Sequence, residues 1–331
     1  MVFNRKPKYL PFPIFGLCFY KDKVLITGGG GGKKFALQNK LLVFYPRTME
    51  QVKELDTGDE LLVSIQYVSS LDFLVGALAR DIVFYKISNN LSINIVSRTE
   101  CEKVKNLNIV KLYGNETKII TAGEEGEIGL WNIEKSGKPN RILKVCAGTE
   151  VFACDCNGII ICAALKNQFC GIFSAKTGQK LKTLYTSDKP NANLMVRYCV
   201  FTDKDLLTLS TSKSSSYLTR WNLDENFSPA DSIKIADTSA AVLKVSKSNK
   251  IAAIGVSDGS VLVINLKSFS VKCTRKEFEM PATCFDFNAK ETGLMVGSAD
   301  YSYSYVQLST YPWYWLLFIS GFVGILSLVL A

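Results

Sequence analysis

Short apolar runs recur along most of the chain, separated by turns rich in Gly, Asn, Asp and Ser. One unit is repeated: an apolar strand that ends in small residues, a polar turn, and a second strand that ends in a bulky residue. The clearest copies lie at 118–132, 207–222 and 252–265. Apolar runs bounded by such turns are typical of β-strands. The body of the chain, from about Phe3 to Ser309, is therefore expected to be all-β.

The bulky residue at the end of the second strand marks the period of the repeat. These markers are Phe44, Phe84, Trp131, Phe173, Trp221, Ile264 and Val306. They lie 40, 47, 42, 48, 43 and 42 residues apart, close to the roughly 40–45 residues of a WD-type propeller blade. Seven markers predict a seven-bladed β-propeller with four strands in each blade. A segment near Lys8 to Phe12 is expected to supply the strand that closes the ring. A pair of β-sandwiches is the alternative.

The C-terminal segment has a different composition from the repeats. No charged residue occurs from Trp313 to Ala331, and as a helix this stretch would span roughly 28 Å, close to the hydrocarbon core of a bilayer. The aromatic residues at its start are typical of the membrane interface. A buried helix of a soluble fold is the alternative, although only Ser320 and Ser327 would form its polar face. We expect a propeller over residues 1–310 and a transmembrane anchor over 311–331. Because the first residues do not resemble a signal peptide, the propeller should face the cytosol.

Charge and composition exclude several kinds of function. The net charge is +9, but the lysines are scattered, which favours a solvated basic surface, with weak attraction to acidic lipid headgroups as the alternative. A nucleic-acid groove would show clustered basic residues with interleaved aromatics. The chain contains no histidine, which removes Ser-His-Asp and Cys-His nucleophile systems and His-ligated zinc. No enzymatic activity and no small-molecule substrate are therefore expected.

Ten cysteines are spread along the chain, mostly in apolar contexts that predict buried free thiols. Cys154 and Cys156 form the one close pair, and alternation along a strand would place both on one side. No second pair follows at zinc spacing, so a metal or redox role is disfavoured. This usage of cysteine fits a reducing compartment.

A run of five glycines, Gly28 to Gly32, follows the strand-like segment Val24–Thr27. Asn39 comes seven residues after the run, directly before another strand at 41–45. Consecutive glycines are costly to order, so a loop that keeps five of them is expected to need a backbone geometry that side chains forbid. A merely flexible loop is the plain alternative. A phosphate cradle is disfavoured, because Lys34 stands where a P-loop needs Ser or Thr and a strand, not a helix, follows.

The segments Thr27–Gly31 and Leu37–Leu41, in the first blade of a propeller with a C-terminal anchor, resemble one family. These are the endoplasmic-reticulum exchange factors for the Sar GTPase, the Sec-twelve and prolactin-regulatory-element-binding proteins. The resemblance implies conversion of a Sar-type GTPase from its GDP to its GTP form, which starts COPII coat assembly. It also implies a location in the endoplasmic-reticulum membrane, with the propeller on the cytosolic side. The motif covers about fifteen residues; elsewhere the sequence is that of a generic propeller.

The resemblance also assigns roles within the loop. In the family, this loop binds potassium through main-chain carbonyls and presses on the switch regions of the GTPase. Here the potassium ligands would come from Gly28, Gly29, Gly30, Gly31 and Asn39. The contact with the GTPase would involve Gly30, Gly31, Gly32, the apolar Leu37, and Asn39, the asparagine tied to activity.

Two features depart from the family pattern. Lys33 and Lys34 occupy positions that are acidic, small or amide residues in the family, and Gln38 stands where proline is common. The lysines would either point outward to acidic residues of the partner or replace the ion. Two rival hypotheses remain: a tail-anchored propeller scaffold without exchange activity, and a tethered propeller hydrolase, which the missing histidine and missing signal sequence disfavour.

Overall fold

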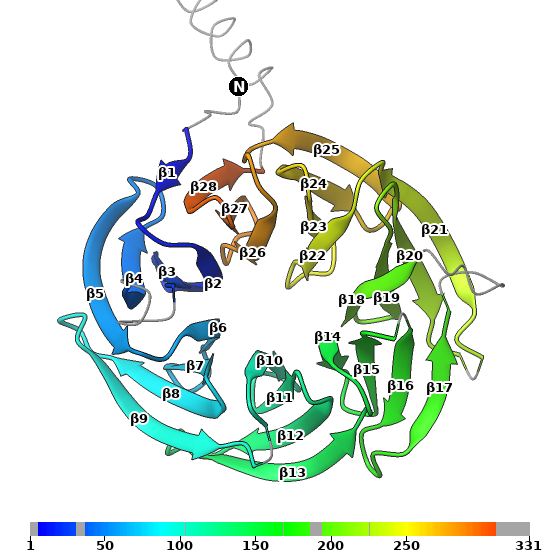
Figure 1. Ribbon diagram of the computed structural model, residues 1–331, viewed down its shortest axis with the longest axis horizontal. Coiled ribbons are helices and arrows are strands. Elements are labelled where there is room, and N and C mark those ends of the chain that lie inside the picture. Colours follow the sequence, from blue (N-terminus) through cyan, green and yellow to red (C-terminus); the bar gives the residue numbers. More distant parts are fainter. Residues whose placement is uncertain are drawn as a thin grey trace, which may run out of the picture.

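The computed structural model describes residues 6–30, 37–102, 104–167, 169–185, 194–224 and 226–308. Within these ranges every regular element is a β-strand, and the strands form seven four-stranded sheets. The sheets follow one another around a ring in the order of the sequence (Figure 1). The predicted seven-bladed propeller is therefore confirmed, and the alternative of two β-sandwiches is wrong.

Six blades are each formed by four consecutive antiparallel strands. Blade 1 contains β2 (Ile14–Tyr20), β3 (Lys23–Gly28), β4 (Asn39–Tyr45) and β5 (Glu50–Gly58). Blade 2 contains β6 (Leu62–Val68), β7 (Phe73–Leu78), β8 (Asp81–Ile87) and β9 (Ile93–Glu100). Blade 3 contains β10 (Leu107–Tyr113), β11 (Lys118–Gly123), β12 (Glu127–Ile133) and β13 (Pro139–Cys146). Blade 4 contains β14 (Val151–Cys156), β15 (Ile160–Leu165), β16 (Cys170–Ser174) and β17 (Lys180–Leu184). Blade 5 contains β18 (Met195–Phe201), β19 (Asp205–Thr211), β20 (Ser216–Asn222) and β21 (Pro229–Ala236). Blade 6 contains β22 (Ala240–Val245), β23 (Ile251–Val256), β24 (Ser260–Asn265) and β25 (Ser270–Lys276).

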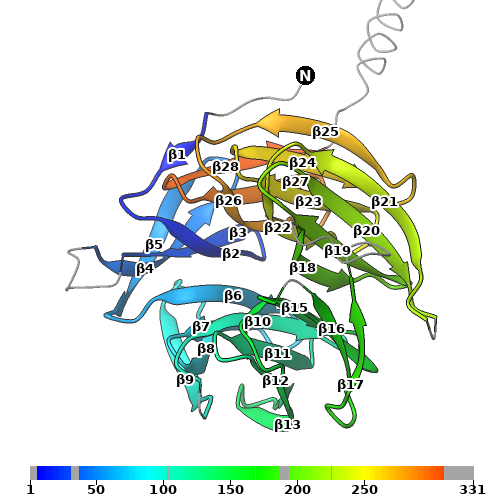
Figure 2. The same ribbon diagram turned by 45° about the vertical axis from the view of Figure 1, so that its right-hand side comes forward.

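The seventh blade is built from both ends of the chain. Its inner three strands are β26 (Ala282–Phe287), β27 (Gly293–Ser298) and β28 (Ser302–Gln307), and the fourth is β1 (Lys8–Tyr9). β1 pairs antiparallel with β28 and lies beside it in both views (Figure 2). The predicted closing strand near Lys8 is thereby confirmed.

The position of a strand within its blade decides how apolar it is. The second strands are buried almost along their whole length, as in β7, where all six residues are buried. The fourth strands lie at the rim of the ring and are mostly exposed, as in β25. A strand covered on both faces needs a continuous apolar run, whereas a rim strand tolerates charged residues. This explains why the apolar runs identify the inner strands best.

The core is divided among the interfaces between blades. The described residues form seven buried apolar clusters, each shared by two neighbouring blades. All seven marker residues lie on the third strand of a blade and are buried. Two of them also bond within the blade: the indole of Trp131 donates to Thr121 Oγ1 at 2.9 Å, and that of Trp221 to Thr208 Oγ1 at 2.8 Å. The sequence period therefore follows the packing of one blade against the next.

Antiparallel pairing gives the disc two faces. We call the lower face the set of turns that join first to second and third to fourth strands, and the upper face the remaining loops and the connections between blades. The glycine loop joins β3 to β4 and so belongs to the upper face. β28 ends at Gln307 on the lower face, where the Leu308 N–H donates to Thr292 O at 2.9 Å. Within the ranges given above there is no helix of the length and apolar character needed to cross a bilayer, and the predicted anchor at 311–331 lies outside those ranges.

Candidate functional site

The glycine loop lies on the upper face of blade 1, next to the chain that enters that blade. Its described residues are Gly28 to Gly30 on one side and Leu37 to Asn39 on the other. The predicted site residues Gly31 and Gly32 lie outside the described residues, as do Lys33 and Lys34. The structure thus describes the base of the loop, with both of its ends in neighbouring strands.

The base of the loop is packed too tightly for side chains. A Cβ atom at Gly29 would lie closer than 3.0 Å to the side chain of Asn39, and one at Gly30 equally close to the side chain of Leu37. Gly28 is the last residue of β3 and lies against the Phe12 ring and Pro13 O. The Gly29 N–H donates to that same carbonyl at 3.2 Å. The first glycines are therefore required by close packing, and flexibility alone does not explain them.

Asn39 is the central polar residue of this base. Its side chain is completely buried, and its Nδ2 donates to Gly58 O, at the end of β5, at 3.0 Å. The backbone of Asn39 pairs with Gly58 as well. A buried amide that holds a main-chain carbonyl fixes the backbone on both sides of it. Asn39 consequently positions the loop from beneath and does not itself reach the surface.

Residues of β5 and the following turn support Gly58 in turn. The Gly58 N–H donates to Asp56 Oδ1 at 2.8 Å, and Thr57 Oγ1 donates to Glu60 O at 3.0 Å. Beside Asn39, Lys40 pairs with Glu54 at 3.1 Å, and the hydrogen bond from Lys40 lowers the pKa of the Glu54 carboxyl. The loop is thus tied to the outer strands of blade 1 through a chain of local bonds.

The atoms of this base that could bind a cation are all oxygen atoms. Asn39 Oδ1 lies beside Gly29, and apart from the exposed Gln38 side chain the other oxygen atoms of the base are main-chain carbonyls. Hard cations prefer such oxygen ligands, so the described residues are chemically compatible with the predicted potassium ion. Among the residues that the structure describes, no group of three or more His, Cys, Asp or Glu side chains is arranged to hold a metal.

The cysteines are placed as the sequence predicted. All ten are free thiols, and eight of them are buried. Cys154 and Cys156 lie in the same apolar cluster between blades 3 and 4, so both face one side of β14. Burial raises the pKa of both thiols, to about 11 for Cys156. Thiols with raised pKa values are poor nucleophiles, in agreement with a structural role.

Sequence reasoning missed the residues that hold the loop from outside the motif. Pro13 and Phe12 approach from the chain that precedes blade 1, and Gly58 approaches from the far end of β5. The only sequence signal for them was position: Phe12-Pro13 directly precedes the first strand, and Gly58 ends the fourth. These contacts depend on the pairing of strands, which the motif itself does not encode.

No protein-family model and no curated protein matches the sequence. Among solved structures, the chain is similar to the computationally designed Ika8 protein, determined by crystallography. The TM-score is 0.64 at 12% sequence identity, and the alignment covers 91% of this chain and 98% of that one. At this identity the likeness concerns the fold alone, so any function has to be argued from the site.

Proposed function

We propose that this chain is a guanine-nucleotide exchange factor for a Sar-type small GTPase, and that the glycine loop of blade 1 makes the decisive contact. In this proposal the protein is attached to the endoplasmic-reticulum membrane and starts COPII coat assembly by loading the GTPase with GTP. The sequence resemblance suggests the partner. The observation that carries the proposal is the fixed base of the loop, in which Gly29 and Gly30 pack on Asn39 and Leu37.

The mechanism requires no covalent step. A surface that binds the nucleotide-free GTPase more tightly than its GDP form weakens GDP binding by the same factor. Each kcal/mol of this difference accelerates release at most about fivefold, so an efficient factor needs a stiff contact surface. A loop braced by a buried amide loses little conformational entropy on binding. Asn39 is a positioning residue in this scheme, whereas Leu37 and the glycines that follow Gly30 would touch the partner.

Potassium is part of the proposal as a ligand of the loop. Asn39 Oδ1 and main-chain carbonyls of the glycine run would hold it, and the ion would supply a fixed positive charge inside the loop. Residues 311–331 would form the membrane anchor, which alkaline carbonate extraction of membranes tests directly. Recovery of the protein in the soluble fraction would contradict the anchor.

The deciding experiment measures the release of a fluorescent GDP analogue from a Sar-type GTPase by the full-length chain, in potassium and then in sodium. We expect release to accelerate with the wild type and to slow markedly with Leu37→Ala. Leu181→Ala is the matched control, because Leu181 is an exposed leucine on β17, the rim strand of blade 4. No acceleration by the wild type would leave the scaffold hypothesis in its place.

A further inference from the structure

The two faces of the propeller differ in charge. In the described lower-face turns, Lys and Arg outnumber Asp and Glu by ten to seven. In the described upper-face loops and connections, Asp and Glu outnumber Lys and Arg by eleven to four. Among the described residues, the basic surplus is therefore absent from the face of the glycine loop.

Two acidic groups of the lower face, Glu116 and Asp72, are neutralised by lysines of other turns on the same face. Glu116 accepts from Lys247 Nζ at 2.8 Å and from the Ser69 N–H at 3.1 Å. Asp72 pairs with Lys21 at 3.0 Å, and Glu291 accepts from the Ser248 N–H at 2.6 Å. Burial alone would raise the pKa of Glu116 and of Asp72, but the hydrogen bonds from their lysine partners lower both values. The Glu116 and Asp72 carboxylates therefore stay ionised, and their charge is compensated within the protein.

Apart from Lys21 and Lys247, the basic groups of the described lower-face turns make no ion pair. Six exposed lysines on blades 3 to 7, which we call the lower-face lysines, share this property: Lys135, Lys176, Lys204, Lys250, Lys267 and Lys290. In the part of the chain that the structure describes, the ammonium groups of these six side chains make no hydrogen bond or ion pair. With the exposed Arg47 and Lys138 they outnumber the exposed Asp22, Glu134, Asp203 and Asp224, so the net charge of the described lower-face turns is positive.

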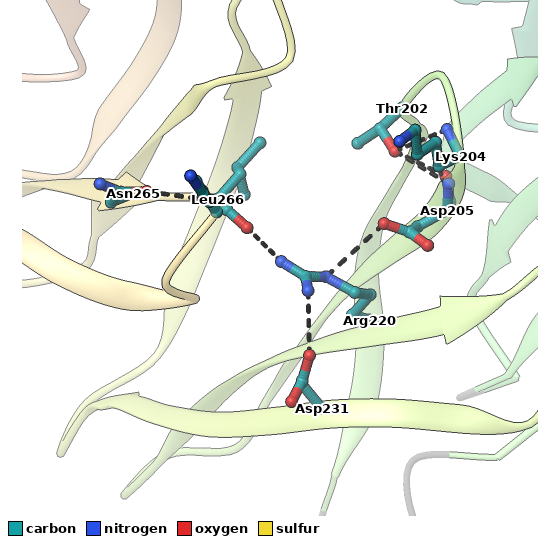
Figure 3. A network of polar contacts seen from close by, with 8 residues as sticks. Thr202, Lys204, Asp205, Arg220, Asp231, Asn265 and Leu266 are labelled. Atoms are coloured by element: carbon teal, nitrogen blue, oxygen red, sulfur yellow. Dashed lines mark hydrogen bonds and ion pairs between the residues drawn. The ribbon is translucent and has the colours of Figure 1, made fainter.

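The turns that carry these lysines are held in place by the frame of the propeller. Figure 3 shows Arg220 of β20 between Asp231, at 3.0 Å, and Asp205, at 3.6 Å, while its third nitrogen donates to Leu266 O in blade 6. Thr202 Oγ1 accepts from the backbone N–H groups of Lys204 and Asp205. This network fixes the turns of Lys204 and Lys267 across the boundary between blades 5 and 6.

The chain leaves the propeller on this same face. β28 ends at Gln307, and the uncharged run begins at Trp313, so five peptide steps separate Leu308 from it. Even at full extension these steps reach only about 17 Å. A membrane that holds the uncharged run can therefore approach the lower face to within one Debye length, about 8 Å at physiological salt.

We propose that the lower face of the propeller is a docking surface for an anionic phospholipid bilayer. This inference rests on the membrane attachment in the proposed function. Charge complementarity and the exit of the chain select the occupant: headgroup phosphates and carboxylates meet the lower-face lysines, and the short connection keeps them there. The disc then lies flat on the membrane, and the glycine loop points away from the lipid.

The test labels lysines of the full-length chain on vesicles with a water-soluble acetylating reagent and reads each site by mass spectrometry. Neutral phosphatidylcholine vesicles are compared with vesicles that contain about 30 mol% phosphatidylserine. We expect the lower-face lysines to be labelled about threefold less on anionic than on neutral vesicles. Lys105 and Lys213 of the upper face should be labelled equally on both. Salt at about 1 M, where the Debye length is about 3 Å, should remove the difference.

A set of lysine-to-glutamine variants tests the same idea. The test variant replaces Lys176, Lys250, Lys267 and Lys290, and the matched control replaces Lys53, Lys105, Lys213 and Lys276, all exposed and outside the lower-face turns. Protection of Lys135 and Lys204 should weaken only in the test variant. Equal labelling on both kinds of vesicle, with the protein bound to both, would overturn the docking surface and leave an acidic protein as its occupant.

Vesicle flotation separates the proposed anchor from the proposed docking surface. An anchored chain floats with neutral vesicles even if its lower face does not bind lipid. If the chain does not float with neutral vesicles, the proposed anchor is wrong. The docking surface is then tested on anionic vesicles alone: protection of the lower-face lysines on these vesicles supports it, and normal labelling of them contradicts it.

Discussion

Replacing Asn39 by alanine separates the stability of blade 1 from the action of its loop. The change removes the bond from Asn39 Nδ2 to Gly58 O, and the carbonyl of the exposed Gly58 can then bond to water. Loss of such a hydrogen bond costs about 0.5–1.5 kcal/mol, and each kcal/mol lowers the melting temperature of a large domain by about 2–4 °C. Since domains have about 5–15 kcal/mol of stability, the propeller should stay folded at 25 °C.

The same energy limits the effect on nucleotide exchange. If the lost energy of about 0.5–1.5 kcal/mol comes from the competent loop geometry, GDP release should slow by about 2–13-fold. Scanning fluorimetry measures the melting temperature, and a fluorescent GDP analogue measures release. Thr208→Val is the control, because it removes the buried bond from Trp221 in blade 5 at an equal or larger cost in stability. A similar slowing by the control, or a normal rate with Asn39→Ala, would refute the positioning role.

Three further predictions concern the frame. In Ellman titration, Cys146 and Cys273, the two exposed thiols of the ten, should react rapidly in the native protein, and the other eight only after denaturation; rapid reaction of more than two would contradict the buried clusters. The free energy of unfolding should decrease as the pH drops below about 4. Burial raises the pKa of the Glu116 and Asp300 carboxyls, but hydrogen bonds lower it further, so the pKa in the folded state lies below the ordinary value. Their contribution to stability is therefore present above the unfolded-state pKa and is lost as the pH falls through the folded-state pKa. A melting temperature that does not change from pH 5 to pH 2, measured by circular dichroism, would argue against it. Removing residues 1–9, and with them β1, should expose the edge of β28 and cause aggregation, seen by light scattering; a monomeric truncated protein would show that closure by β1 is dispensable.

The propeller could be predicted because every blade packs against its neighbours in the same way. Six of the seven markers, all except Phe84, fill equivalent positions toward the preceding blade, and equivalent positions impose similar residue types. The second blade had the weakest sequence signal, yet β6 to β9 form a complete sheet. In its third strand Tyr85, and not the marker Phe84, takes the place of the tryptophan of blades 3 and 5. Tyr85 packs toward the preceding blade, as Trp131 and Trp221 do, whereas Phe84 packs toward the following blade.

The candidate site was predictable only in part. The glycine run identified the loop, because several glycines in sequence need a reason. The burial of Asn39 and its bond to Gly58 come from the pairing of β4 with β5, and no local pattern predicts which carbonyl a side chain meets. The charge difference between the faces was equally hidden, because lysines scattered along the sequence gather only when alternate turns fall on the same side.

The closure of the ring by β1 also affects how the protein is made. During vectorial synthesis β1 is among the first segments to leave the ribosome, but its partner β28 follows almost three hundred residues later. Until then the nascent chain carries an unpaired strand at each end of its incomplete ring, and such edges attract other strands. Newly made copies should therefore depend on chaperones until the last blade emerges, and crowded polysomes would favour exchange of β1 between neighbouring chains.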